Sequence, residues 1–249
     1  MKKKWFVIPK PNINADLKLI CFPYAGGSAS TFLSWTKTLP ANVELIIIQA
    51  PGRGARIGEP AYSNMQALMS DLIKIVPSVL NKPYIFFGHS LGSRIAFELM
   101  NQLKVLNHVL PLHFIASASR GPQHKCNKEP VYNLSRDEFI KALKRLNGTP
   151  RMVLENKELM DLFLPLLKAD FEIASRYYYQ GEARFNCSIS VFGGEDDFDI
   201  SRSMLDSWGD HFSTDADVHL LPGDHFFIDS HSKLVQQKVN DIIQTCLSI

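Results

Sequence analysis

One short motif constrains the fold of this chain more than any other part of its sequence. Residues 88–92 read GHSLG, which matches the pattern G-x-S-x-G. An apolar run at 84–87 precedes the motif, and a helical pattern at 93–100 follows it. In this pattern a buried strand turns abruptly into a helix, and the serine occupies a strained apex that only residues without a side chain can flank. We therefore interpret Ser90 as a presented nucleophile and not as a serine that caps an ordinary helix.

Short apolar runs alternate with longer amphipathic segments along the chain, which is typical of a mostly parallel sheet with helices on both faces. The triplets at 46–48 and 85–87 are continuously apolar, as strands covered on both faces are. The sequence therefore predicts a single α/β domain over residues 1–249. The expected strands are 17–22, 43–48, 84–87, 112–118, 188–192 and 218–221, and the expected helices are 28–39, 64–80, 90–106, 201–212 and 230–246.

The alternation is interrupted between about residues 121 and 181. Two helical patterns stand there in place of a strand, one that begins with a capping residue near 135 and one from about 156 to 179. Because this stretch precedes the strand at 188–192, we expect a helical lid over Ser90; extra helices packed on the core are the alternative. The apolar positions of the second pattern outnumber those needed to pack on one neighbour, so some of them are expected to line an acyl channel under the lid: Leu159, Leu162, Phe163, Leu166 and Phe171.

A serine hydroxyl needs a neighbouring base, and an acid must hold that base in orientation. With a G-x-S-x-G serine the acid and the histidine follow in that order, each in the loop after a later strand. His225 lies within residues 222–227 (PGDHFF), directly after the last expected strand, and is predicted to be the base. The pattern does not choose among the carboxylates of the loop after 188–192, which are Glu195, Asp196, Asp197 and Asp199.

The negative charge that develops on a substrate carbonyl needs two backbone N–H donors, which together form an oxyanion hole. One donor is expected from Leu91, the residue after the nucleophile. The other is expected from residues 24–28 (YAGGS), between the first long strand and a helix, where glycines allow the backbone to approach a substrate. A simple glycine-rich turn is the alternative interpretation of this segment.

Composition and charge argue against several other classes. The net charge is +2 and the basic residues are spread along the chain, whereas a nucleic-acid-binding protein needs a clustered basic face. No apolar run approaches the roughly 18 residues of a membrane helix, and the segment before Pro9 is too short for a signal peptide. The four cysteines lie far apart, and neither metal-ligand spacing nor a dinucleotide or phosphate-binding glycine loop is found. We therefore expect a cytoplasmic monomer with reduced thiols and without a cofactor, metal or membrane contact.

Four motifs together resemble the type II thioesterases, the stand-alone editing enzymes of nonribosomal peptide and polyketide synthesis. They are residues 22–29 (FPYAGGSA), 51–59 (PGRGARIGE), 88–92 and 222–227, and the resemblance extends from about residue 17 to the C-terminus. It implies an α/β-hydrolase fold with a mobile helical lid and a Ser–Asp–His triad. It also implies that acyl groups are hydrolysed from the phosphopantetheine arm of carrier proteins.

The resemblance also assigns roles to individual residues. Ser90 is the implied nucleophile and His225 the implied base. The family's acid motif is similar to G-x-x-D-P and selects Asp197 here, although Phe198 stands where the family has proline. The implied oxyanion donors are the amides of Ala25 and Leu91.

Two other functions use the same fold. One is a medium-chain acyl-carrier or acyl-coenzyme A thioesterase, or a carboxylesterase, with the same triad. The other is a binding protein without catalysis, and an intact triad argues against it.

Overall fold

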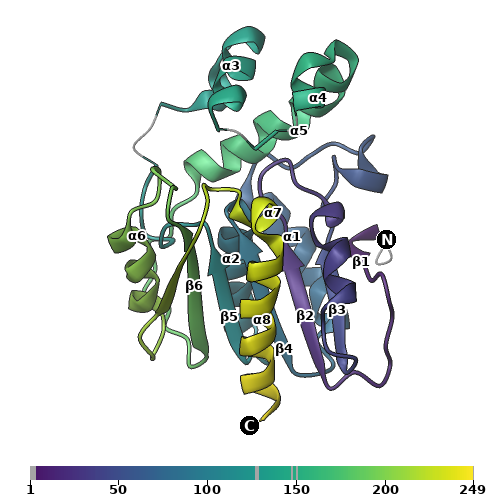
Figure 1. Ribbon diagram of the computed structural model, residues 1–249, viewed down its shortest axis with the longest axis vertical. Helices are drawn as coiled ribbons and strands as arrows, with labels where there is room; N and C mark the ends of the chain where they lie inside the picture. Colours follow the sequence, from purple (N-terminus) through teal and green to yellow (C-terminus); the bar gives the residue numbers. More distant parts are fainter. Residues whose placement is uncertain (1–3, 127–128, 147, 150, 249) are drawn as a thin grey trace.

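A seven-stranded sheet forms the centre of the computed structural model, which describes residues 4–126, 129–146, 148–149 and 151–248 (Figure 1). The strand order is β1-β3-β2-β4-β5-β6-β7; β1 pairs with β3 in antiparallel orientation, and the other pairings are parallel. All six expected strands are present, with ends that shift by at most two residues. The very short β1 was not predicted, because two residues show no alternation. The strands are β1 (Phe6–Val7), β2 (Leu17–Phe22), β3 (Val43–Ile48), β4 (Tyr84–His89), β5 (His113–Ser117), β6 (Ser188–Gly194) and β7 (Asp217–Leu221).

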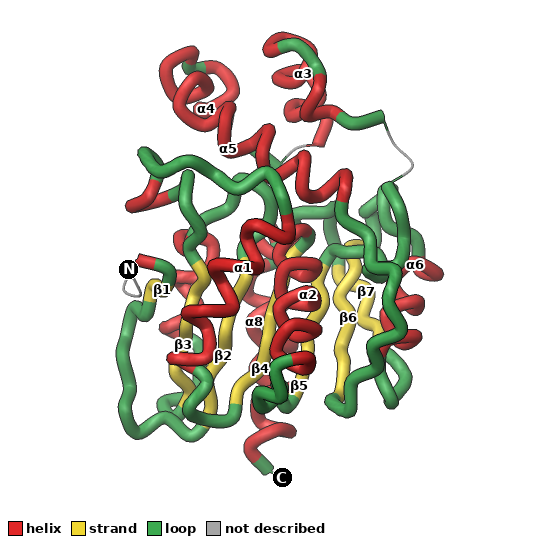
Figure 2. Tube along the Cα trace, turned by 180° about the vertical axis from the view of Figure 1, so that it is seen from behind, coloured by secondary structure: helices red, strands yellow, loops and turns green. Residues whose placement is uncertain are grey.

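Helices cover both faces of the sheet, which is why every residue of β2, β3 and β4 is buried. The 3₁₀ helix η2 (Ala29–Lys37) and the α-helix α8 (Ser232–Leu247) pack on one face (Figure 1). On the other face lie α1 (Met65–Ile75), α2 (Leu91–Val105) and α6 (Arg202–Asp206), of which α1 and α2 stand in front in Figure 2.

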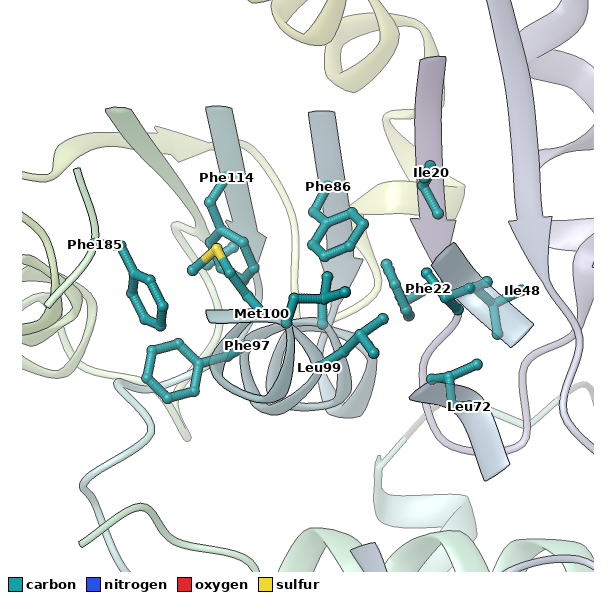
Figure 3. Packing of buried hydrophobic residues seen from close by; sticks show 14 of the residues in the cluster. Ile20, Phe22, Ile48, Leu72, Phe86, Phe97, Leu99, Met100, Phe114 and Phe185 are labelled. Atoms are coloured by element: carbon teal, nitrogen blue, oxygen red, sulfur yellow. The ribbon is translucent and has the colours of Figure 1, made fainter. Parts of the chain in front are cut away.

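The helix α2, which follows Ser90, is held in place by its packing against the sheet. Figure 3 shows Met100 of α2 directed at the strands that carry Phe86 and Phe114, while Phe97 of the same helix points toward Phe185. The Phe97 ring meets Phe185 edge-on, with 5.6 Å between the ring centroids. These five side chains are fully buried, so the start of α2 is held against a closely packed sheet.

Three expected helices differ from the prediction. The segment 28–39 forms the 3₁₀ helix η2 and not an α-helix. The segment 64–80 begins at the cap residue Asn64 but divides into α1 and the 3₁₀ helix η4 (Val76–Val79), because Pro77 has no N–H and its ring blocks the preceding turn. The segment 201–212 likewise divides into α6 and the 3₁₀ helix η6 (Ser207–His211).

The stretch that interrupts the strand–helix alternation is helical, and we call residues 131–176 the helical insertion. Figure 1 shows its helices together beyond one end of the sheet. It has a small core of its own, in which Phe139, Leu143, Met160 and Leu167 are buried. The helix α4 was not predicted, because it spans only one turn. The insertion comprises η5 (Val131–Asn133), α3 (Arg136–Leu146), α4 (Arg151–Glu155) and α5 (Lys157–Arg176).

Candidate active site

Ser90 lies at the turn between β4 and α2 with backbone angles of φ 54° and ψ −116°. Positive φ is unusual for a residue that is not glycine, so the turn is strained. The flanking glycines make it possible: a Cβ on Gly88 would lie 2.4 Å from the Cα of Ser93, and one on Gly92 would lie 2.0 Å from the carbonyl oxygen of Phe22. The spacing of the motif is therefore a packing requirement.

Ser90, His225 and Asp197 form a continuous chain of hydrogen bonds. His225 Nδ1 lies 2.7 Å from Asp197 Oδ2, and His225 Nε2 lies 2.8 Å from Ser90 Oγ. Because the carboxylate only accepts, the Nδ1–H donates to Asp197, and Nε2 is left to accept the Ser90 hydroxyl proton. This arrangement can withdraw the proton from Ser90 as its oxygen attacks a carbonyl carbon.

The four carboxylates that the sequence left open are now distinguished by their surroundings. Asp197 is 9% exposed and its second oxygen accepts the amide N–H of Asp199 at 3.1 Å. Glu195, Asp196 and Asp199 are exposed, and it is Asp197 that bonds to His225.

His89, the residue before the nucleophile, also supports the site. Its Nε2 lies 2.9 Å from the backbone oxygen of His225, and its Nδ1 lies 2.9 Å from Ser117 Oγ. A carbonyl only accepts, so Nε2 carries the hydrogen and Nδ1 accepts from the serine. Burial, reinforced by His225, lowers the pKa of His89 to about 3, which keeps the ring neutral. No sequence signal marks this role, because the contact joins residues that are far apart along the chain.

The loop after β2 has two amides that are already engaged. The N–H of Gly26 donates to Asp170 Oδ2 at 2.7 Å, and the N–H of Gly27 donates to the carbonyl oxygen of Tyr24 at 2.9 Å. Among the described residues, no acceptor is found for the amides of Ala25 and Leu91. Ala25 lines the same cavity as Ser90, and the amides of Ala25 and Leu91 stay the predicted oxyanion donors.

A cavity of about 370 Å³ lies over Ser90 and His225. Its apolar wall includes Phe171 and Ala174 of α5 and Leu146 of α3, so the helical insertion covers the serine. Of the five expected channel positions only Phe171 lines this cavity. The other four do not line it: Leu166 is buried, Leu162 is 49% exposed, Phe163 packs on the insertion's own core, and Leu159 is partly exposed.

Neither a metal site nor a membrane-spanning helix is present in the described part of the chain. Among those residues, no cluster of three or more histidine, cysteine, aspartate or glutamate side chains could hold a metal ion. No helix within the same residues is long and apolar enough to cross a membrane.

The site and the order of the strands define a serine hydrolase with the α/β-hydrolase fold. A family model for the thioesterase domain matches residues 17–245, and the chain belongs to this family.

Individual relatives agree with this assignment. The chain is 38% identical to the gramicidin S biosynthesis protein GrsT of Aneurinibacillus migulanus, over 90% of this chain and 88% of the relative. It is 32% identical to the medium-chain S-acyl fatty acid synthase thioesterase of Homo sapiens, over 96% of this chain and 90% of the relative. The solved structure of ClbQ from the colibactin nonribosomal peptide and polyketide pathway superimposes with a TM-score of 0.88 and 32% identity, covering 93% of this chain and 98% of ClbQ.

Proposed function

We propose that this thioesterase removes acyl groups from the phosphopantetheine arm of carrier proteins in nonribosomal peptide or polyketide synthesis. The main observation in support of this function is the hydrogen-bonded chain from Ser90 through His225 to Asp197, which lies beneath a covered cavity. The similarity to GrsT and ClbQ supports the pathway class. The proposed setting is the cytoplasm, which suits four free cysteines, and the proposed active form is a monomer.

In the proposed mechanism Ser90 Oγ attacks the thioester carbonyl carbon and His225 Nε2 takes the hydroxyl proton. Asp197 stabilises the imidazolium, and the amides of Ala25 and Leu91 stabilise the carbonyl oxygen as it becomes negative. The C–S bond then breaks, and the proton on His225 goes to the departing thiol. Water attacks the acyl-serine ester with His225 again as base, which releases the carboxylic acid and restores Ser90.

The helical insertion is proposed to act as a lid over this chemistry. The cavity wall that it contributes would hold the acyl group, while a pantetheine arm would enter as a long thin chain. A neighbouring open cavity of about 760 Å³ shares Tyr24, Asp196, Asp224 and Phe226 with the first and offers space for that arm.

The nucleophile is tested by substitution and by labelling. We expect Ser90→Ala to retain the fold and to lose several orders of magnitude of turnover on an acyl-pantetheine, since loss of the nucleophile removes the whole triad's contribution. A fluorophosphonate should label the wild-type enzyme on the peptide that carries Ser90. Labelling of another serine, or normal turnover by the variant, would rule out the mechanism.

A metabolic medium-chain thioesterase for acyl-carrier or acyl-coenzyme A substrates is the second candidate, supported by the similarity to the human S-acyl fatty acid synthase thioesterase. The two are separated by measuring kcat/KM for one short acyl group on a carrier protein and on coenzyme A under identical conditions. The carrier role predicts the higher value for the carrier, because protein contacts add binding energy that a small thiol lacks. Equal or faster cleavage of the coenzyme A ester would favour the metabolic role.

A further inference from the structure

A buried ion pair joins the helical insertion to the loop after β3, and both of its members also bond to the loop after β2. Asp170 of α5 is 2% exposed, and Arg53, from the PGRG segment, is 7% exposed. The guanidinium donates two hydrogen bonds to the carboxylate, at 2.8 Å to Oδ1 and 3.1 Å to Oδ2. Asp170 Oδ2 also accepts the Gly26 N–H, and Arg53 Nη1 donates to the Gly27 carbonyl oxygen at 3.3 Å. Both members of the pair therefore hold the backbone that carries Ala25.

The loop and α5 are in direct contact at Gly26. Its φ of +75° lies in the left-handed region, and a Cβ there would lie 2.5 Å from Leu167 Cδ2. The backbone conformation favours glycine here, and the absence of a Cβ lets the Leu167 side chain lie against the loop. Leu167 and Asp170 lie three residues apart on one face of α5, so a single helical turn presses on the loop and accepts its N–H.

The bond to Gly26 controls the direction of the peptide group between Ala25 and Gly26. In a trans peptide the N–H and the C=O point in opposite directions. With the Gly26 N–H held toward Asp170, the Ala25 carbonyl is turned away from that carboxylate and cannot exchange places with the N–H. The backbone of Ala25 is thereby fixed immediately beside its own free amide.

We propose that Asp170 and Arg53 are positioning residues that orient the Ala25 amide toward the substrate carbonyl. The helical insertion is then a structural part of the oxyanion hole as well as its cover. The inference rests on the proposed roles of Ser90 and Ala25.

Stability alone is a weak reason for such a pair, because desolvation offsets much of the attraction between two buried charges. Replacement of a buried ion pair by apolar side chains of similar size is often neutral for stability, whereas removal of one partner leaves a buried charge unpaired. The pair must therefore be changed as a unit to separate positioning from folding.

Two double variants of matched size make this separation. Arg53→Gln with Asp170→Asn removes both charges but keeps an amide oxygen that can accept the Gly26 N–H. Arg53→Met with Asp170→Leu also removes both charges and leaves no acceptor for that N–H. Glu59→Gln is the control for the same segment, because it weakens an ion pair with Arg56 that does not touch the loop after β2.

The readouts are kcat and KM on an acyl-N-acetylcysteamine thioester, the inhibition constant of an aryl boronic acid that forms a tetrahedral adduct on serine, and the thermal midpoint. Loss of one oxyanion donor typically lowers kcat by about 10²–10³-fold, so a misdirected donor should lower it by about tenfold to hundredfold. We expect the Met/Leu variant to lose kcat by that factor and to bind the boronate correspondingly more weakly, with little change in KM. The Gln/Asn variant should remain within about threefold of wild type, and Glu59→Gln should be unchanged.

A folded Met/Leu variant with wild-type kcat and boronate affinity would overturn the inference, as would equal losses in both double variants. If the Met/Leu variant fails to fold, the Gln/Asn variant decides: a large fall in its kcat at an unchanged thermal midpoint contradicts the role of the Gly26 acceptor, and wild-type kcat supports it. A wild-type enzyme that does not cleave the small thioester, or a Ser90→Ala enzyme that does, refutes the proposed function instead. The two failures are thus distinguishable, and neither depends on a carrier protein.

Discussion

Asp197 differs from the other carboxylates in the loop after β6 in its surroundings and not in its chemical type. Asp197 is buried and bonded to His225, whereas Asp196 beside it is exposed and lines the cavity mouth. A carboxylate that holds a histidine in one tautomer must be fixed by its neighbours, and only burial with further hydrogen bonds provides that.

Conversion of each aspartate to asparagine tests this difference. We expect Asp197→Asn to lower kcat by about 10⁴-fold, because the amide no longer holds the tautomer in which Nε2 accepts the serine proton. Asp196→Asn should change kcat only slightly. Steady-state turnover of one acyl-pantetheine by both purified variants gives the comparison, with circular dichroism as the check on folding. A larger loss of kcat for Asp196→Asn would show that Asp196, and not Asp197, is the acid of the triad.

The residues of the site differ in how far the sequence could predict them. Ser90 and His225 follow from local motifs, because a strand–turn–helix and a loop after a late strand leave signals within a few residues. Asp197 required a family resemblance. His89 and Asp170 were not found, because each acts through a backbone group more than 130 residues away along the chain.

At the scale of elements, the sheet and the long helices were predictable, since burial on both faces and three- to four-residue spacing are local patterns. The sequence could not predict which side of each helix in the insertion faces the serine. The apolar positions of α5 could turn toward the serine or toward α3, and the choice depends on how α3 packs beside it. Only Phe171 among the expected channel residues lines the cavity, where its ring also meets Phe139 edge-on at 5.8 Å.

Shortening this side chain should therefore change the preferred acyl length. Phe171→Ala removes a ring from the wall of the cavity that Ser90 also lines, and so enlarges the cavity. Each additional methylene that a substrate buries there contributes about 0.8 kcal/mol, or roughly fourfold in binding. We expect the ratio of kcat/KM for hexanoyl to that for acetyl thioesters to rise at least about fourfold. Phe163→Ala in the same helix is the matched control and should leave the ratio unchanged. A shifted ratio in the control variant alone would place the acyl group elsewhere.

At the scale of the whole molecule, a half-buried histidine makes stability depend on pH. Burial, partly opposed by Asp217, lowers the pKa of His113 to about 4, and its Nε2 lies 2.9 Å from Ser190 Oγ. In the unfolded chain the ordinary pKa is about 6.5. Between these two values the unfolded chain binds the additional proton, so stability must decrease as the pH falls through this window.

The variant His113→Gln should reduce that dependence while it keeps a polar partner for Ser190. We expect the free energy of unfolding, measured in urea at pH 4.5, 5.5 and 6.5, to fall less steeply than in the wild type. The difference in slope should correspond to at most about one proton. Parallel slopes for the two proteins would show that His113 does not stay neutral in the folded state.

Because Ser90 has a positive φ, we expect the fold to be more stable when glycine replaces this serine, although the activity is then lost. A non-glycine residue in such a conformation carries about 1–3 kcal/mol of strain, whereas a glycine there loses only about 0.5–1 kcal/mol through the entropy of the unfolded chain. Ser90→Gly should therefore raise the free energy of unfolding by about 1 kcal/mol while it abolishes turnover, and Ser90→Ala, which keeps a Cβ, should not. Urea unfolding of the two inactive variants provides the measurement, and a glycine variant no more stable than the alanine variant would contradict it. Selection for stability alone would then remove the nucleophile, so the serine at position 90 persists only where hydrolysis itself is required.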